Sequence, residues 1–158
     1  MIALPLLNPE GVTDEEVATY KKRDSVRAIV QDADGNIALL HATIYNYYKL
    51  PGGGVDEGES LIEALKRECK EEIGCAIEIL NEVGSLTEYR KQRSLNQVSY
   101  CYTARVVGEK GESALEPGEV AHGFVTVWLP IGEARVAVLS GSTSVYDATY
   151  MIARDTAL

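Results

Sequence analysis

The sequence predicts an α+β fold in which a mixed β-sheet is sandwiched between helices. Short runs of β-branched and aromatic residues recur along the chain, and one well-marked helix interrupts them. These elements do not alternate in the βαβ rhythm of a parallel sheet. With 158 residues, of which 46% are apolar and 25% are charged, the chain has the size and composition of one globular domain. We therefore expect a single domain over residues 1–158.

Strands are expected where β-branched, aromatic and aliphatic residues cluster between turn signals. The predicted strands are 26–30, 37–40, 47–50, 76–83, 86–89, 97–107 and 123–129. The first two are joined across Asp34-Gly35, a dipeptide whose tolerance of positive φ favours a tight hairpin turn. The third ends at Pro51, because proline cannot donate a hydrogen bond to a neighbouring strand.

The best-marked helix is predicted over Leu61–Ile73. Ser60 and Glu63 have the spacing of a capping box, in which each side chain caps the backbone N–H of the other. No glycine or proline interrupts the segment until Gly74, which is typical of a helix C-terminus.

Two weaker helical signals and one loop complete the expected fold. Thr13 and Glu16 also have capping-box spacing, which predicts a short helix or turn near the N-terminus. Residues 143–157 carry apolar side chains at helical spacing and predict a C-terminal helix. Residues 108–118 are polar, acidic and glycine-rich, so we expect a mobile loop there.

The helix over Leu61–Ile73 has three faces when its residues are placed at about 100° intervals. The apolar face, which we expect in the core, carries Leu61, Ile62, Leu65, Cys69 and Ile73. A mixed-charge face carries Glu63, Lys66, Arg67 and Lys70. The third face holds Glu68, Glu71 and Glu72 without a lysine among them. Such like-charged neighbours destabilise an isolated helix by about 0.2–0.5 kcal/mol per pair, so we expect something to compensate them.

A divalent cation is one way to compensate this acidic face. Mg²⁺ typically takes one or two carboxylates and keeps its remaining positions for water and substrate phosphates. The segment 51–54, Pro-Gly-Gly-Gly, lets the backbone approach closely and offers carbonyl oxygens, and Asp56, Glu57 and Glu59 add further carboxylates. The residues therefore fit Mg²⁺ or Mn²⁺ bound together with a phosphorylated substrate, and an ordinary solvated acidic surface is the alternative.

Residues 53–75 resemble the Nudix box, G-x5-E-x7-R-E-U-x-E-E-x-G-U, in which U is an apolar residue. The charged and glycine positions of the box are matched by Gly53, Glu59, Arg67, Glu68, Glu71, Glu72 and Gly74. Cys69 and Cys75 stand at apolar positions, where a cysteine behaves as a small hydrophobic residue.

The resemblance to the Nudix hydrolase family implies a Nudix fold and Mg²⁺-dependent hydrolysis of a nucleoside diphosphate linked to another moiety, with Mn²⁺ as a substitute. By position, Glu68 and Glu72 would be metal ligands, and the carbonyl of Gly52 would be a further ligand. Glu71 would be either a ligand or the base that activates water.

Two further catalytic roles are implied by the resemblance. Glu59 would bind or orient metal-bound water, and Arg67 would hold the glutamates in position through salt bridges. The alternative for Arg67 is an i,i+4 pair with Glu63 on the outer face of the helix.

Substrate signals outside the box are weaker. The stretch after the box lacks the proline associated with ADP-ribose hydrolases, and residues 38–43 do not resemble the signature of the coenzyme A subfamily. A nucleoside triphosphate or a modified, oxidised nucleotide is therefore the expected substrate. A non-catalytic Nudix module that binds a nucleotide or a protein partner as a sensor is the alternative, although the retained glutamates weigh against it.

Five residues outside the box are candidates for substrate contacts. Arg27 and Arg90 could bind phosphates, against the alternative of surface charge. Tyr48 and Phe124 could stack on a base, although aromatic residues on strands more often pack in the core. Glu119 could supply another carboxylate from the loop, or simply be solvated there.

Composition limits the partners of the protein. A net charge of −9 argues against bulk electrostatic binding to nucleic acid, so we expect a small-molecule nucleotide substrate. The three cysteines lack C-x-x-C spacing, and no apolar run is long enough to span a membrane. We expect a soluble, cytoplasmic protein without a membrane partner, and a homodimer is a possible assembly.

Overall fold

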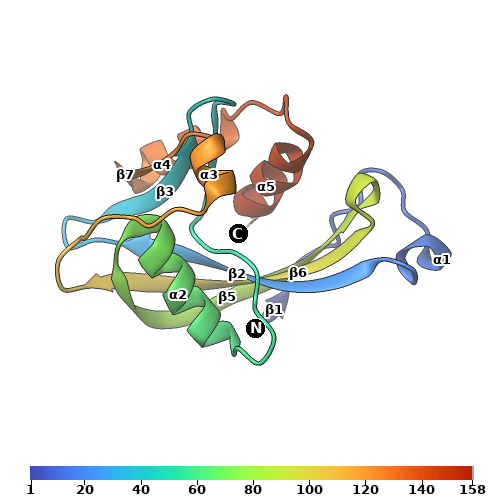
Figure 1. Cartoon of the computed structure of the whole chain (residues 1–158), viewed down its shortest axis with the longest axis horizontal. Helices are drawn as coiled ribbons and strands as arrows, with labels where there is room; N and C mark the ends of the chain where they lie inside the picture. Colours follow the sequence, from blue (N-terminus) through green and yellow to red (C-terminus); the bar gives the residue numbers. More distant parts are fainter. Residues whose placement is uncertain (158) are drawn as a thin grey trace.

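The structure is a computed structural model that describes residues 1–157, and Figure 1 shows the course of the chain. The elements follow in the order β1 (Ile2–Ala3), α1 (Asp14–Val17), β2 (Lys21–Gln31), β3 (Asn36–Ala42), β4 (Tyr47–Lys49), α2 (Leu61–Ile73), β5 (Ala76–Arg90), the 3₁₀-helix η1 (Lys91–Arg93), β6 (Leu95–Val107), α3 (Pro117–Ala121), β7 (Phe124–Pro130), α4 (Ile131–Leu139) and α5 (Tyr146–Ala157). Within residues 1–157, no helix is both long and apolar enough to cross a lipid bilayer. The predicted α+β class is confirmed.

The seven strands form one mixed sheet in the order β1-β5-β6-β2-β3-β4, and β7 pairs with β3. β2 runs parallel to β6 along its whole length, from Lys21 opposite Leu95 to Gln31 opposite Arg105. By contrast, β2 and β3 share one registered pair, Gln31 opposite Ile37. The sheet therefore opens between β2 and β3. In Figure 1, β2 and β6 extend beyond the helices towards α1.

The glycine-rich segment 51–54 lies along the edge of β2 that β3 leaves free. Val26 N–H donates to the carbonyl oxygen of Gly53 at 2.9 Å, and Ala28 N–H donates to that of Pro51 at 3.0 Å. These bonds satisfy backbone groups of β2 that would otherwise lack a sheet partner. The segment is thus fixed to the sheet immediately before α2 begins.

The core forms two clusters, one on each face of β3. Leu40 belongs to the first cluster, to which α2 contributes Leu65, and Leu39 belongs to the second, to which α4 contributes Val138. Successive side chains of a strand point to opposite faces. The sheet therefore lies between α2 on one side and α4 on the other, as the sequence predicts.

The two ends of α2 also lie where the sequence predicts them. The hydroxyl of Ser60 accepts the Glu63 N–H at 3.3 Å, and the Glu63 carboxylate accepts the Ser60 N–H at 2.9 Å. Gly74 ends the helix with φ +67°, a left-handed conformation that favours glycine. A Cβ at Gly74 would lie 2.3 Å from the carbonyl oxygen of Gly111, so the residue also permits close packing of the following loop.

The predicted apolar face of α2 is wrong at Ile62, which is 38% exposed. Ala64 and Glu72 are buried instead. Because the carboxylate of Glu72 finds hydrogen-bond donors inside the protein, α2 turns part of its acidic face inwards and Ile62 outwards.

Other differences concern the ends of elements. The strands predicted at 76–83 and 86–89 form one strand, β5, since irregularities at Ile79/Asn81 and Glu82/Gly84 let it bend while it stays paired with β6. The loop predicted at 108–118 ends in α3, because Pro117 presets a helical φ at its first position. The predicted helices near Thr13 and at the C-terminus are confirmed as α1 and α5, whereas β1, α3 and α4 were not anticipated.

We expect Leu65→Ala to lower the free energy of unfolding by about 2–5 kcal/mol, because Leu65 is fully buried between α2 and the sheet. Urea denaturation followed by far-UV circular dichroism measures this change. Ile62→Ala, three residues earlier on the exposed side of α2, is the matched control and should cost less than about 1 kcal/mol. Equal losses in the two variants would contradict the orientation of α2.

Candidate active site

A cavity of about 260 Å³ lies where the glycine-rich segment, α2 and α3 meet the edge of β2. Its lining residues are Arg23, Arg27, Lys49, Gly52, Gly53, Gly54, Asp56, Arg67, Glu68, Glu71, Glu72, Glu116, Glu119 and Met151. Six of these side chains are acidic and four are basic, which leaves an excess of two negative charges. Its charge therefore favours a cation over an anion that enters alone.

Two glycines allow the backbone to approach both the sheet and the helix at this point. Gly52 has φ +130°, and a Cβ there would lie 2.1 Å from the carbonyl oxygen of Val26. A Cβ at Gly53 would lie 2.3 Å from Glu68 Oε1. Both distances are shorter than any van der Waals contact, so a side chain at position 52 would displace the backbone of the segment, and one at position 53 would displace the carboxylate of Glu68.

Glu72 is held in the interior of the site by two donors. Gly52 N–H donates to Oε2 at 2.5 Å, and Lys49 Nζ donates to Oε1 at 2.7 Å. Burial raises the pKa of Glu72 to about 7, although the charge of Lys49 opposes this shift. Glu72 therefore exchanges its proton near neutral pH in the protein without a metal ion.

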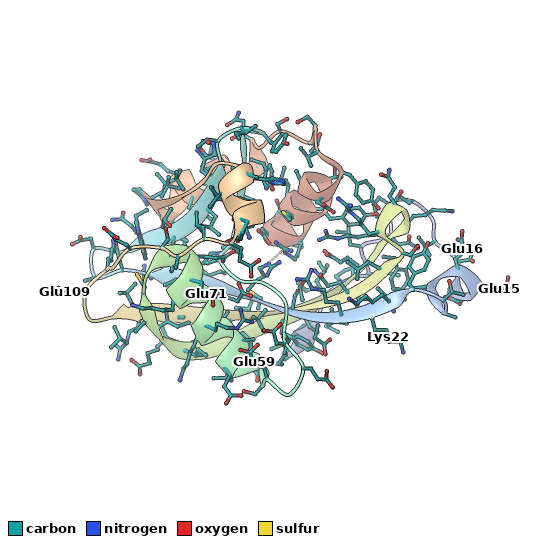
Figure 2. All side chains as sticks on the ribbon, in the orientation of Figure 1. Glu15, Glu16, Lys22, Glu59, Glu71 and Glu109 are labelled. Atoms are coloured by element: carbon teal, nitrogen blue, oxygen red, sulfur yellow. The ribbon has the colours of Figure 1, made fainter. Side chains whose placement is uncertain are left out.

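Arg67 binds the carboxylates around the opening of the site. Its Nε and Nη2 each donate to one oxygen of Glu59 at 2.9 Å, and Nη1 donates to Glu68 Oε1 at 2.9 Å and to Glu71 Oε2 at 3.2 Å. The hydrogen bonds to Glu59 raise the pKa of Arg67, and the same bonds lower the pKa of Glu59. The salt bridges predicted for Arg67 are present, whereas Glu63 bonds to Ser60 instead. Figure 2 labels Glu71 on α2 and Glu59 just before the helix begins.

Arg27 and Glu119, two of the candidates for substrate contacts, both line this cavity. Arg27 is buried, its Nη1 donates to the carbonyl oxygen of Val26 at 2.6 Å, and burial together with the charge of Arg154 lowers its pKa to about 10. Glu119 lies on α3, not in a mobile loop as predicted, with its carboxylate 3.6 Å from Lys49 Nζ. Burial works to raise the pKa of Glu119, but its hydrogen bond with Glu72 and the charge of Lys49 lower it below the usual value.

The aromatic candidates for substrate contacts do not line this cavity. Tyr48 points to the face of β4 opposite Lys49 and packs in the second cluster, stacked on His41 with ring centroids 4.2 Å apart. Phe124 is buried in the first cluster, where its ring lies 4.9 Å from Lys49 Nζ. Their placement follows the alternation of side chains along the strands, so both rings show the core packing that was the alternative to stacking on a base.

Arg90 is also absent from the cavity. It is buried on β5, forms ion pairs with Glu88 and Asp147, and lies over the ring of Tyr150. These contacts tie the sheet to α5, which explains its burial without a substrate.

Lys49 is the main residue of the site that the sequence analysis missed. It is the last residue of β4, two positions before Pro51, and it reaches Glu72 from the strand. The sequence signal that could have identified Lys49 was its position as a basic residue next to the glycine-rich segment.

The oxygen donors at the cavity fit a hard divalent cation. Glu68, Glu72 and Glu119 line it together with Gly52, whose backbone carbonyl adds an uncharged oxygen. Within residues 1–157, however, no three His, Cys, Asp or Glu side chains already converge as ligands of one metal ion. Arg67 and Lys49 hold the carboxylates instead, so the donors would have to rearrange around a cation.

Comparison with known proteins assigns the family. A model of the NUDIX domain matches residues 21–147, from the start of β2 into α5. The chain belongs to the Nudix hydrolase family. This confirms the resemblance seen in residues 53–75, and the match covers most of this Nudix chain.

Two relatives match the Nudix chain over different lengths. The RNA pyrophosphohydrolase of Caulobacter vibrioides is 31% identical over 144 residues, which cover 80% of this chain and 82% of that protein. A shorter match to the RNA pyrophosphohydrolase of a Sulfurovum species is 55% identical over 46 residues, covering 28% of this chain and 29% of that protein.

Solved structures share the Nudix fold at low sequence identity. A NUDIX hydrolase from Nitrosomonas europaea has a TM-score of 0.62 at 21% identity and covers 85% of this chain and 90% of that chain. A MutT protein from Methanosarcina mazei has a TM-score of 0.58 at 20% identity and covers 86% of this chain and 96% of that chain. These two structures support the fold alone.

We expect the stability of this Nudix protein, kept in a chelator, to decrease from pH 5 to pH 7 because of Glu72. The pKa of Glu72 is near 7 when folded and near 4.5 when unfolded, so the folded state holds an extra proton in this window. Its contribution to the free energy of unfolding therefore falls by roughly 1 kcal/mol per pH unit as pH rises. Urea denaturation at several pH values measures the slope.

The slope attributable to Glu72 is the difference between the wild type and Glu72→Gln, which cannot titrate. Glu63→Gln is the control, because hydrogen bonds with Ser60 lower the pKa of Glu63 and keep it out of this pH window. Identical slopes in the wild type and Glu72→Gln would contradict the raised pKa of Glu72.

Proposed function

We propose that the protein is a Mg²⁺-dependent pyrophosphohydrolase that cleaves a pyrophosphate bond in a nucleoside 5′-triphosphate, carried by a free or modified nucleotide or by the 5′ end of an RNA. The observation that carries this proposal is the acidic cavity, in which the glutamates of the Nudix box and the backbone of Gly52 meet. The names of the RNA pyrophosphohydrolases similar to this chain support the RNA end as a substrate. The net charge of −9 favours the small nucleotide.

Glu68, Glu72 and the Gly52 carbonyl are the groups that would hold Mg²⁺, and Mn²⁺ could replace it because it prefers the same oxygen ligands. When bound, the metal ion supplies neutralisation of phosphoryl charge and activation of water. Glu119 would add a carboxylate from α3, which also lines the cavity. A metal ion held by these groups would offset the negative charge of the cavity, which would otherwise repel the phosphates of the substrate.

Glu71 is the best placed of the box glutamates to act as the base. Its side chain is 38% exposed, compared with 14% for Glu68 and 2% for Glu72. Its salt bridge to Arg67, at 3.2 Å, is longer than those of Glu59 and Glu68 to the same arginine, both at 2.9 Å. A base must reach the proton of a water molecule that attacks phosphorus from solvent. Glu71 would accept that proton while the bond to the leaving phosphate breaks.

Arg67 and Glu59 would act by positioning. Both oxygens of Glu59 bind Arg67, so Glu59 fixes the orientation of the guanidinium group, which in turn fixes Glu68 and Glu71. Arg27 lines the same cavity and would donate to a phosphate oxygen of the substrate.

A substrate panel tests the proposal. The purified protein is incubated in Mg²⁺ or Mn²⁺ with nucleoside triphosphates, oxidised nucleotides, nucleotide sugars and a 5′-triphosphorylated RNA, and released phosphate and pyrophosphate are measured. We expect metal-dependent release from one of the triphosphate substrates. Tight nucleotide binding by calorimetry, with no release from any compound, would instead support the alternative of a non-catalytic sensor.

We expect Glu72→Gln to reduce kcat at least about 100-fold, because the change removes one ligand charge with almost no change in volume. Glu63→Gln is the matched control on the same helix, and glutamine still completes a capping box with Ser60. The control should keep nearly full activity. Wild-type turnover in a correctly folded Glu72→Gln protein would contradict the role of Glu72 as a ligand.

A further inference from the structure

Lys49 forms contacts with two carboxylates that the proposed function gives to a metal ion. Its Nζ lies 2.7 Å from Glu72 Oε1 and 3.6 Å from Glu119 Oε1. The two glutamates come from α2 and α3, so the ammonium group joins two helices that line the cavity. The ammonium group of Lys49 thus lies where Glu72 and Glu119 would neutralise a bound metal ion.

The ammonium group has little access to solvent. The side chain of Lys49 is 8% exposed, and the ring of Phe124 lies 4.9 Å from Nζ on the protein side. A buried charge is costly unless it is paired, and the aromatic face and the two carboxylates supply that pairing. The ammonium group of Lys49 is therefore held beside Glu72 by charge pairing as well as by burial.

A divalent cation and Lys49 are like charges with the same partners. A metal ion that binds Glu72 must share or replace the hydrogen bond from Nζ, and the two positive charges repel each other across a poorly solvated cavity. Binding of one charge lowers the affinity for the other, and this coupling is reciprocal.

We propose that Lys49 is an internal competitor of the metal ion, which lowers the affinity of the site for divalent cations when no substrate is bound. This inference rests on the proposed function, because it requires that Glu72 and Glu119 bind the metal. Lys49 is a positioning residue in this role, since it acts through the two carboxylates.

The competition also couples metal binding to substrate binding. Once a metal ion takes the carboxylates, the ammonium group remains in the cavity with less negative charge around it. The phosphates of a nucleotide carry the charge that would neutralise it. Metal and substrate binding therefore favour each other, and a low affinity for the metal alone follows from the same lysine.

Titration with Mn²⁺ in the absence of nucleotide, followed by electron paramagnetic resonance of the free ion, tests the proposal. We expect Lys49→Met to bind Mn²⁺ at least about five-fold more tightly than the wild type, the lower end of common coupling strengths. Lys49→Arg keeps the positive charge and should bind Mn²⁺ no more tightly than the wild type. Lys66→Met removes an exposed charge from α2 and should leave the affinity nearly unchanged.

An unchanged or weaker Mn²⁺ affinity in folded Lys49→Met would overturn the proposal. Loss of a residue that merely stabilises the site would leave metal binding unchanged or weaken it, whereas loss of a competitor tightens it. Circular dichroism checks folding, and Lys49→Gln, which still donates to Glu72, gives the same test if the methionine variant does not fold. Failure of both the wild type and Lys49→Met to bind Mn²⁺ would overturn the metal assignment itself. Binding of Mn²⁺ with equal affinity by the wild type and by folded Lys49→Met would overturn only the role of Lys49.

Discussion

The contact between the glycine-rich segment and α2 is the constraint on which the site depends. Gly52 and Gly53 let the backbone lie against β2 on one side and against Glu68 and Glu72 on the other. The Gly52 N–H then fixes one oxygen of Glu72, and this bond accounts for a carboxylate in the interior of the protein. The opening between β2 and β3 makes room for the segment, so the topology of the sheet and the chemistry of the site are linked.

Charge balance explains how this acidic cluster is stable in a folded protein. Arg67 neutralises the carboxylates near the opening, and Lys49 neutralises those further inside. Their combined charge leaves the cavity short of full compensation, in keeping with a site that takes a cation together with an anionic substrate. The net charge of the whole chain, −9, describes this local arrangement poorly.

The sequence predicted the parts of the site that one helix and its flanking loop determine. Residues Glu68, Glu71 and Glu72 share a helix face because of their spacing, and the capping residues around α2 are local signals of the same kind. The sequence was less informative where distant segments meet. Tyr48 and Phe124 were candidates either for stacking on a base or for core packing, and the structure places both rings in the core clusters, outside the cavity.

Lys49 and Ile62 also show that the burial of a side chain cannot be predicted from its own helix or strand alone. Ile62 belongs to the apolar side of the helix by its spacing, yet Ile62 is exposed while Glu72 is buried. The buried carboxylate is stabilised by Lys49 on β4 and by the Gly52 N–H, two donors that lie outside the helix. Burial of a carboxylate is therefore a property of the assembled cavity, and the graded exposure of Glu72, Glu68 and Glu71 follows from it. That gradient separates an inner residue suited to holding a cation from an outer one suited to exchanging protons with water.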